Sequence, residues 1–462
     1  MATAAITMVD THRPIPLEKG SPIVGCLPAM AKDPLAFFKG LAEKHPDVVE
    51  FRFPNIDMAL VTDTNLAQQI LIKQTDKFRK SDRDMSIMGV LLGNGLVTNN
   101  SQKSHKIQRK LIQPGFHFRR IQDYADTMID YTDRYLSDWK PEQSRDISDD
   151  MFKLTMFIVS KTLFNTNMED MAQGSDQIGK AIHVFQNITN KRFNQLFQWP
   201  EWIPTPSNIK AKKARTVLHQ KIDSMLESRK QVDGSVSDAG DLMSMLLNAK
   251  YEDGTKMSTQ QIMDELLTLF VAGHETTSNA LTWTFYLLAK HPEIQQKLFL
   301  ELDNVLTGNT PTFEDLENLS YTEMVVKEAM RILPSVWTLN CRQANEDTVV
   351  GDYLFPKNKV LFISPYANHH NPRFFPNPEV FDPERFTPER EKLLPRFAYI
   401  PFGAGPRVCI GNSFAMMEAK LILATIVKRF EFSLCEGQEL ALQPQITLSN
   451  KGGMKLNFKQ RF

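Results

Sequence analysis

The chain has 462 residues, 42% of them hydrophobic, and its 54 basic side chains balance its 54 acidic ones. That much apolar material can fill a large core, while a net charge of zero gives no support to bulk binding of nucleic acid. Four cysteines are too few and too scattered for a secreted disulfide framework, so we expect a reducing, cytoplasmic setting.

The N-terminal region carries no recognisable targeting signal. Its first residues, MATAAITMVDTHRP, lack a basic start followed by an apolar stretch. The sequence also lacks any run of about 18 apolar residues, so we expect no transmembrane segment, while contact with one face of a membrane stays open. Residues 1–30 are rich in Pro and Gly and predict an irregular arm.

The next segment predicts a helix followed by a β-hairpin. Asp33 is a capping residue, and Pro34 then occupies the first helical position, where proline is favoured. Hydrophobic residues alternate over 48–53, and a second apolar stretch ends at Val61 after a Pro-Asn turn. We therefore expect two antiparallel strands here.

Residues 64–330 have a mostly helical pattern. The Pro-rich segment 200–207 breaks it, and the segment 232–240 predicts a surface loop. The longest predicted helix is 259–290, which would be about 45 Å long and would cross a whole domain. Ser258 and Gln261 predict a capping box at its start, and a proline two residues past its end prevents continuation.

The pattern changes after residue 331. Short strand-like runs at 348–350 and 359–364 precede a Pro-rich stretch, 371–388, that we expect to be irregular but ordered. A final helix over about 411–430 is followed by a C-terminal hairpin. The sequence therefore predicts one domain over residues 1–462, mainly α-helical with small β-sheets.

The segment 402–411, FGAGPRVCIG, carries the most information about function. Its three glycines, at 403, 405 and 411, permit tight turns and close approach by a flat ligand. Cys409 would lie at a helix N-terminus, where the dipole and free amides favour a thiolate. For a single cysteine a buried structural role is the better interpretation. Here, however, all five fixed positions of the pattern FxxGxRxCxG match, which chance would give about once in ten thousand such chains.

This pattern resembles the heme-binding loop of the cytochromes P450. The resemblance implies that Cys409 is the thiolate ligand of the iron of heme b, where it favours cleavage of the O–O bond of O2. It also implies that Phe402, Gly403 and Gly411 contact the cofactor and that Arg407 reaches a heme propionate.

The segment 272–277, AGHETT, lies in the middle of the predicted long helix. Burying its polar residues costs free energy unless they find partners, and a Thr hydroxyl can bond the carbonyl four residues back and distort the helix. Alone, the segment would be interpreted as a polar helix face. In a chain that also contains the cysteine loop, this segment resembles the family's oxygen-activation motif. The resemblance implies that Ala272 contacts the heme and that Glu275 and Thr276 relay protons.

Two further motifs match the family. Glu328 and Arg331 share a helix face and could be a common surface pair. The resemblance implies instead a buried structural triad completed by Arg385.

His105 and Arg109 are four residues apart on one predicted helix face, so both side chains could reach one anionic group. A solvated helix surface is the alternative. The resemblance implies that both bind a propionate, and that Arg342, in a looser sequence context, does the same.

Together the motifs imply the cytochrome P450 fold, with heme between the long helix and the cysteine loop. They also imply a monooxygenase that uses O2 and two electrons. The chain ends at Phe462, so we expect no fused reductase and a separate ferredoxin- or flavin-type donor. Basic residues could form its docking face or could be ordinary solvated charges: Lys103, Lys106, Lys110, Arg119 and Arg120.

The expected substrate is a hydrophobic small molecule such as a fatty acid, terpenoid or steroid, with a fatty acid slightly favoured. Candidate contacts are apolar, and each could equally be core: Met85, Ile87, Met88, Leu91, Leu92, Phe270, Val336 and Trp337. We expect a monomer. The alternatives are a peroxide-using relative, which the acid–threonine pair disfavours, a non-catalytic heme sensor, and a helical scaffold without heme.

Overall fold

The structure is a computed structural model. It describes residues 12–54, 56–172, 175–193, 195, 199–227 and 241–461. The helices are α1 (Leu27–Lys32), α2 (Pro34–Lys44), α3 (Thr64–Gln68), α4 (Asp82–Leu92), α5 (Gln102–Ile112), α6 (Phe118–Leu136), α7 (Ile147–Phe164), α8 (Met168–Ala172), α9 (Ser175–Phe193), α10 (Pro206–Glu227), α11 (Leu242–Asn248), α12 (Thr259–Lys290), α13 (Pro292–Val305), α14 (Ser320–Ile332), α15 (Pro365–His369), α16 (Pro388–Glu391) and α17 (Asn412–Arg429).

The strands are short and lie mainly near the two ends of the chain. They are β1 (Val48–Phe53), β2 (Ile56–Val61), β3 (Phe78–Lys80), β4 (Glu142–Asp146), β5 (Arg342–Ala344), β6 (Thr348–Val350), β7 (Tyr353–Phe355), β8 (Val360–Phe362), β9 (Phe430–Leu434), β10 (Leu442–Pro444), β11 (Leu448–Asn450) and β12 (Lys455–Gln460). The prediction of a mainly α-helical fold with small sheets is confirmed.

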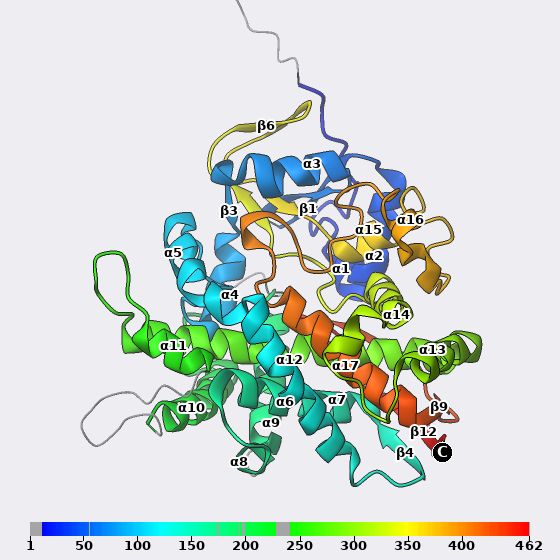
Figure 1. Cartoon of the computed structure of the whole chain (residues 1–462). Helices are drawn as coiled ribbons and strands as arrows, with labels where there is room; N and C mark the ends of the chain where they lie inside the picture. Colours follow the sequence, from blue (N-terminus) through cyan, green and yellow to red (C-terminus); the bar gives the residue numbers. More distant parts are fainter. Residues whose placement is uncertain are drawn as a thin grey trace, which may run out of the picture.

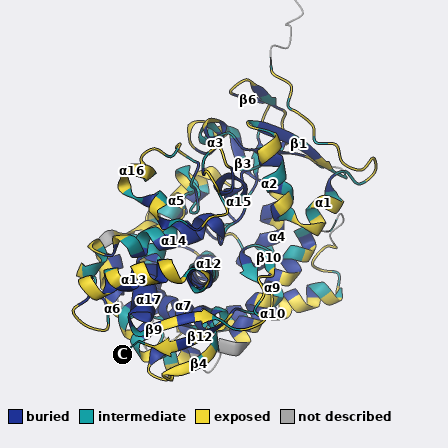
Figure 2. Cartoon of the chain, turned by 90° about the vertical axis from the view of Figure 1, so that its right-hand side faces the viewer, coloured by how far each residue is buried: buried dark blue, intermediate teal, exposed yellow. Residues whose placement is uncertain are grey.

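Helix α12 runs through the middle of the molecule and has the bounds that the sequence predicts (Figure 1). Seen along its axis, it is surrounded by other elements (Figure 2). It buries apolar residues around much of its circumference, as a helix in the core of a large protein does. Helix α17 crosses it on one side, and α7 packs along it.

The predicted capping box at the start of α12 forms only in part. The hydroxyl of Ser258 accepts from the backbone N–H of Gln261 at 3.1 Å. The side chain of Gln261 does not return to Ser258; it donates to the carbonyl of Asn94 and to the carboxylate of Glu265. The contact with Asn94 comes from tertiary packing, which cannot be predicted from the residues around Gln261.

The predicted hairpin is present, with Val48 opposite Val61 in an antiparallel pair, β1–β2. This pair belongs to a five-stranded sheet of order β1-β2-β8-β5-β3. The C-terminal hairpin is β10–β11. A further sheet, β4-β12-β9, joins residues about 310 positions apart, and strand β4 was not predicted from the sequence.

The N-terminal arm is less irregular than predicted. Residues 1–11 lie outside the described residues. Leu17 bridges to Glu50, and α1 forms where Pro28 can start a helix. The predicted loop at 232–240 also lies outside the described residues, whereas the Pro-rich stretch 371–388 is mostly irregular apart from a 3-10 turn, Pro383–Phe386.

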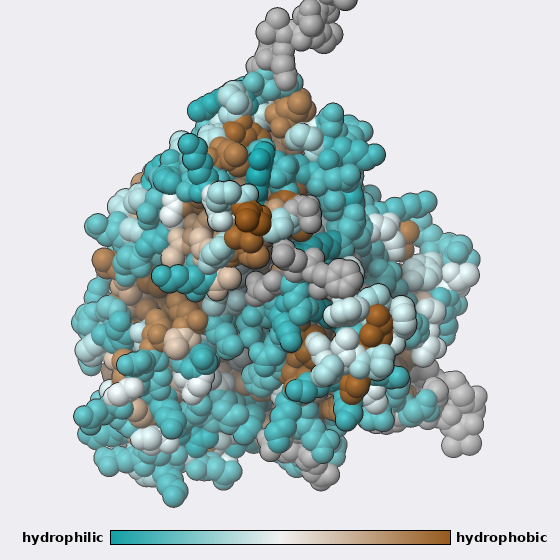
Figure 3. Space-filling view, turned by 180° about the vertical axis from the view of Figure 1, so that it is seen from behind, coloured by the Kyte–Doolittle hydropathy of each residue, from teal (hydrophilic) through white to brown (hydrophobic). Residues whose placement is uncertain are grey.

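The surface is mostly polar, in keeping with the many charged residues of the chain (Figure 3). One face is largely hydrophilic with separate hydrophobic areas (Figure 3). Within the described residues, no helix combines the length and the apolar character that crossing a membrane requires.

Candidate active site

A cavity of about 350 Å³ lies between α12 and the segment that leads into α17. We call it the central cavity. Every residue predicted from the sequence to be catalytic or to bind the cofactor lines it, although these residues come from distant parts of the chain. They are His105, Arg109, Ala272, Glu275, Thr276, Arg342, Phe402, Gly403, Arg407, Cys409 and Gly411.

The cysteine loop is held by backbone hydrogen bonds and by two glycines with positive φ. The N–H of Cys409 donates to the carbonyl of Phe402 at 2.9 Å. Gly403 and Gly405 have φ of 69° and 73°, a region that disfavours other residues. A Cβ on Gly405 would also lie 1.9 Å from the carbonyl oxygen of Leu71, so this position admits only glycine.

Gly411 differs from the other two glycines. Its φ of −95° suits any residue, and a Cβ there would meet only the ring of Phe116, at 3.6 Å. Of the two reasons expected for these glycines, a tight turn and close approach by a ligand, the first does not apply to Gly411. Gly411 lies on the cavity wall, so its close approach to a ligand stays a prediction.

The side chain of Cys409 is solvent-accessible, although protein atoms surround its thiol, because it lies on the wall of the central cavity. It lies three residues before α17 begins, near the expected helix N-terminus. Burial raises the pKa of its thiol, opposed by the Gly411 N–H and by Arg109. The sequence argument predicted that the helix end would favour the thiolate, but desolvation is the larger effect in this environment.

A group of basic side chains, Lys80, His105, Arg109, Arg342 and Arg407, faces the same cavity. Burial, together with the other cations, lowers the pKa of His105 to about 3, so this imidazole is neutral. Burial also lowers the pKa of Arg342 and of Arg407 to about 10. Lys80 is buried and the three arginines are half-buried. Like charges at this spacing favour an anionic partner.

Three of these side chains donate hydrogen bonds to backbone carbonyls. Arg109 donates to the carbonyl of Val408 at 2.7 Å, Arg342 to that of Asn340 at 2.6 Å, and Lys80 to that of Val97. Among the described residues lining the cavity, the one acidic side chain is Glu275.

Arg407 supplies the clearest sign of a missing anion, because its Nη2 is buried without a hydrogen-bond partner. These groups fit a ligand with carboxylates on a flat apolar frame, as heme has. Sequence reasoning missed Lys80. A lone lysine in a three-residue strand gives no signal; only its burial, 6% exposed, beside other cations marks it.

On α12, Glu275 is buried with polar partners on two other elements. Its carboxylate accepts from Gln186 of α9 and from Thr447 beside β11. Burial raises its pKa to about 7. Thr276 donates to the carbonyl of Ala272 at 2.8 Å, the back-bond expected from sequence, and α12 continues through this point without a break.

The Glu–Arg motif forms the expected triad. Arg331 makes two hydrogen bonds, of 2.7 and 2.8 Å, to the carboxylate of Glu328, and both side chains are fully buried. Arg385 lies 3.3 Å from the same carboxylate. Arg331 also donates to the carbonyl of His369 at 2.9 Å, which ties α14 to the segment that precedes the cysteine loop.

The apolar wall is only partly the one expected. Of the candidate contacts, Met88, Leu92 and Val336 line the cavity. The other candidates are buried in the core: Met85, Ile87, Leu91, Phe270 and Trp337. Apolar residues that sequence reasoning did not single out complete the wall, among them Leu96, Val97, Val159, Leu163, Phe185 and Ile446.

Comparisons with known proteins agree with this geometry. The cytochrome P450 family model matches residues 15–458. Cyclooctat-9-en-7-ol 5-monooxygenase of Streptomyces melanosporofaciens is 35% identical over 91% of this chain and 89% of its own length. Pentalenene oxygenase of Streptomyces avermitilis is 30% identical, with 89% and 90% covered. Cytochrome P450 4V2 of Homo sapiens is 30% identical, with 97% and 90% covered. The chain belongs to the cytochrome P450 family of heme monooxygenases.

Proposed function

We propose that this enzyme hydroxylates a neutral, hydrocarbon-rich molecule of the terpenoid class, using heme b, O2 and electrons from a separate protein. The observation that supports the cofactor site is the meeting of one cysteine and several basic side chains at an apolar cavity beside α12, where the Nη2 of Arg407 is buried without a hydrogen-bond partner. Cys409 would be the metal ligand. Within the described part of the chain no cluster of three His, Cys, Asp or Glu side chains could hold a metal, so further donors would come from the cofactor itself.

Lys80, Arg109, Arg342 and Arg407 would bind the two propionates of heme b, and His105 would donate one N–H. Ala272, Phe402, Gly403 and Gly411 would contact the ring. When bound, heme supplies activation of O2 and transfer of one oxygen atom to a C–H bond, for which thiolate ligation is suited.

Glu275 and Thr276 would handle protons at the cavity wall. A carboxyl group with a pKa of about 7 is well matched to taking up and releasing a proton near neutral pH. The Thr447 hydroxyl that donates to Glu275 belongs to the same wall. The Thr276 hydroxyl is held toward Ala272 and would orient water or a bound polar group.

The choice of a neutral substrate rests on the charges around the cavity. A fatty acid carboxylate in the cavity would need a cationic partner. Among the described residues that line the cavity, all basic side chains belong to the group assigned to the propionates. Two relatives carry the names of terpenoids, cyclooctat-9-en-7-ol and pentalenene. These two observations replace the slight preference for a fatty acid.

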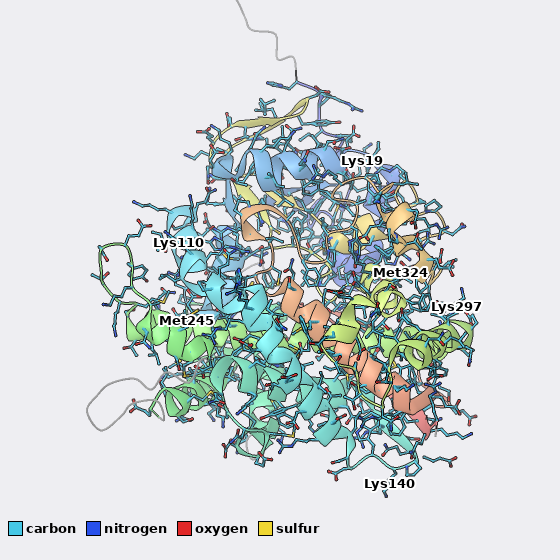
Figure 4. All side chains as sticks on the ribbon, viewed as in Figure 1. Lys19, Lys110, Lys140, Met245, Lys297 and Met324 are labelled. Atoms are coloured by element: carbon cyan, nitrogen blue, oxygen red, sulfur yellow. The ribbon has the colours of Figure 1, made fainter. Side chains whose placement is uncertain are left out.

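An electron donor would bind beside α5. Lys103, Lys106 and Arg119 are exposed there, as is Lys110, which lies at the edge of the molecule (Figure 4). Lys110 pairs with Glu252, but both side chains are solvent-exposed, so an acidic partner could displace that contact at little cost. Complementary charge would then steer a ferredoxin- or flavin-type protein to this face.

The test of the cofactor site is the absorption spectrum of the reduced protein with carbon monoxide. We expect a strongly red-shifted Soret band in the wild-type protein and in Cys435→Ala, whose cysteine does not line the cavity and donates to Asn457 of β12. Cys409→Ala should lose that band. Retention of the band in Cys409→Ala, or its absence from well-folded wild-type protein grown with heme, would contradict the assignment.

The substrate class is tested by the spin-state shift of the loaded enzyme. Cyclic sesquiterpenes and diterpene alcohols should shift the Soret band at low micromolar concentration. Saturated fatty acids with the same number of carbons should need at least tenfold more. Equal or tighter binding of the fatty acids would contradict the proposal of a neutral substrate.

A further inference from the structure

Two neighbouring carboxylates on α12, Asp264 and Glu265, lie outside the proton-handling pair and are nevertheless buried, with exposures of 6% and 0%. Buried carboxylates are costly unless they accept hydrogen bonds. Both here accept from the backbone of one segment, residues 93–99 between α4 and α5, which we call the 93–99 loop. Two residues of this loop, Leu96 and Val97, form part of the cavity wall.

The contacts are specific. Glu265 accepts from the N–H of Leu96 at 2.8 Å, and Asp264 accepts from the N–H of Asn94 at 2.8 Å. Each carboxylate also accepts from a glutamine one turn earlier on α12, at 2.7 Å. The two carboxylates are therefore held in place by their own helix while they hold the loop.

The loop can lie this close to α12 because of two glycines. A Cβ on Gly93 would be 2.2 Å from the Asp264 carboxylate, and a Cβ on Gly95 would be 2.1 Å from the hydroxyl of Thr268. The far end of the loop meets the basic group, since Lys80 donates to the carbonyl of Val97 and Arg407 to that of Asn99. The loop thus spans from the carboxylates of α12 to the cations of the cavity.

We propose that Asp264 and Glu265 are positioning residues that hold the 93–99 loop closed over the central cavity and thereby set the affinity for apolar ligands. Neither lines the cavity, so they act through Leu96 and Val97. Without the acceptor at Glu265, the Leu96 N–H would be buried and unpaired, and the loop would move away to reach water. The ligand-affinity part of this inference rests on the proposed function, because it is measured on heme-loaded protein. The effect on the loop itself does not depend on heme.

The ligand assay compares 4-phenylimidazole with imidazole on the heme-loaded protein, measured by the shift of the Soret band. Imidazole itself reports the heme, whereas the phenyl ring needs the apolar wall. We expect Glu265→Ala to weaken 4-phenylimidazole about tenfold and imidazole less than about twofold. Glu265→Gln should stay near wild type, because burial raises the pKa of Glu265 to about 7 and a neutral amide can still accept from Leu96.

Glu301→Ala is the matched control. The Glu301 carboxylate on α13 also accepts backbone N–H groups, those of Tyr321 and Thr322, but at the start of α14 and not at the cavity. Its loss should lower the melting temperature and leave both affinities unchanged. Equal weakening in Glu301→Ala and Glu265→Ala, or no weakening in Glu265→Ala, would overturn the inference.

Hydrogen–deuterium exchange of heme-free protein separates this inference from the proposed function. The amides of the 93–99 loop should exchange faster in Glu265→Ala than in wild type and Glu265→Gln. Unchanged exchange would overturn the inference even if the heme spectrum is as expected. Faster exchange would support it even if the carbon monoxide spectrum fails.

Discussion

Glu275 is the residue whose chemistry depends most on its surroundings. Its carboxyl is removed from water, and burial raises its pKa from 4.5 to about 7. In an unfolded chain it would titrate near 4.5. Between these two values the folded protein binds more protons than the unfolded chain, so the contribution of Glu275 to stability is present below pH 4.5 and is lost as pH rises through 7.

Replacing Glu275 with Gln removes this titration and keeps an oxygen that can accept from Gln186 and Thr447. We therefore expect Glu275→Gln to gain stability relative to wild type between pH 4.5 and pH 8, by about 3 kcal/mol at most. Melting temperatures of both proteins across this range measure the difference. The same substitution at the exposed Glu439 should follow wild type, and a Glu275→Gln profile parallel to wild type would contradict the expected titration.

At the scale of elements, the cysteine loop depends on backbone geometry and on the Glu328–Arg331–Arg385 triad. The triad holds the segment before the loop, since Arg331 donates to the carbonyls of His369 and Val380. Removing one partner of such a buried group costs several kcal/mol, because it leaves a buried charge unpaired. Its role is therefore structural, as the sequence comparison implied.

The loop glycines lead to a graded prediction. Gly405→Ala should abolish heme incorporation, because its Cβ would collide with the backbone of Leu71. Gly403→Ala should cost about 1–2 kcal/mol from its positive φ alone, since Leu339 is at an ordinary contact distance. Gly411→Ala should leave the melting temperature of heme-free protein unchanged and reduce heme content.

Heme content from the pyridine hemochrome spectrum and melting of heme-free protein measure these effects. Loss of stability in heme-free Gly411→Ala would show that the backbone, and not a ligand, requires glycine there.

For the whole molecule, we expect folding to be coupled to cofactor binding through the basic group, Lys80, His105, Arg109, Arg342 and Arg407. Its members come from β3, α5, β5 and the cysteine loop. Their mutual repulsion is a cost to the heme-free protein, and it would become an attraction once propionates bind.

Arg407→Met should therefore have opposite effects in the two forms. In heme-free protein it removes one of the repelling cations, whose burial lowers its pKa to about 10, and should stabilise the fold by roughly 1–3 kcal/mol. In loaded protein it would remove a proposed propionate partner and should lower the melting temperature. Destabilisation of both forms would show that the hydrogen bond from Arg407 to Asn99 outweighs the repulsion.

Much of this protein could be predicted from local sequence. The capping residues Asp33 and Ser258 correctly predicted where α2 and α12 begin, because a helix cap depends on residues close in sequence. The pattern around Cys409 identified the family, since a loop that must hold a flat ligand tolerates few residue types. The spacing of His105 and Arg109 placed both on one face of α5, and both line the cavity.

The remaining features of the site were decided by tertiary structure alone, because they depend on which distant segments of the chain pack together. Nothing in the sequence near Lys80 indicates that it lies beside Arg407, or that burial lowers its pKa well below the ordinary value. The apolar candidates Phe270 and Val336 look alike in sequence, yet one is core and the other is cavity wall. Asp264 and Glu265 were not singled out from the sequence, and only packing against the 93–99 loop makes them its acceptors.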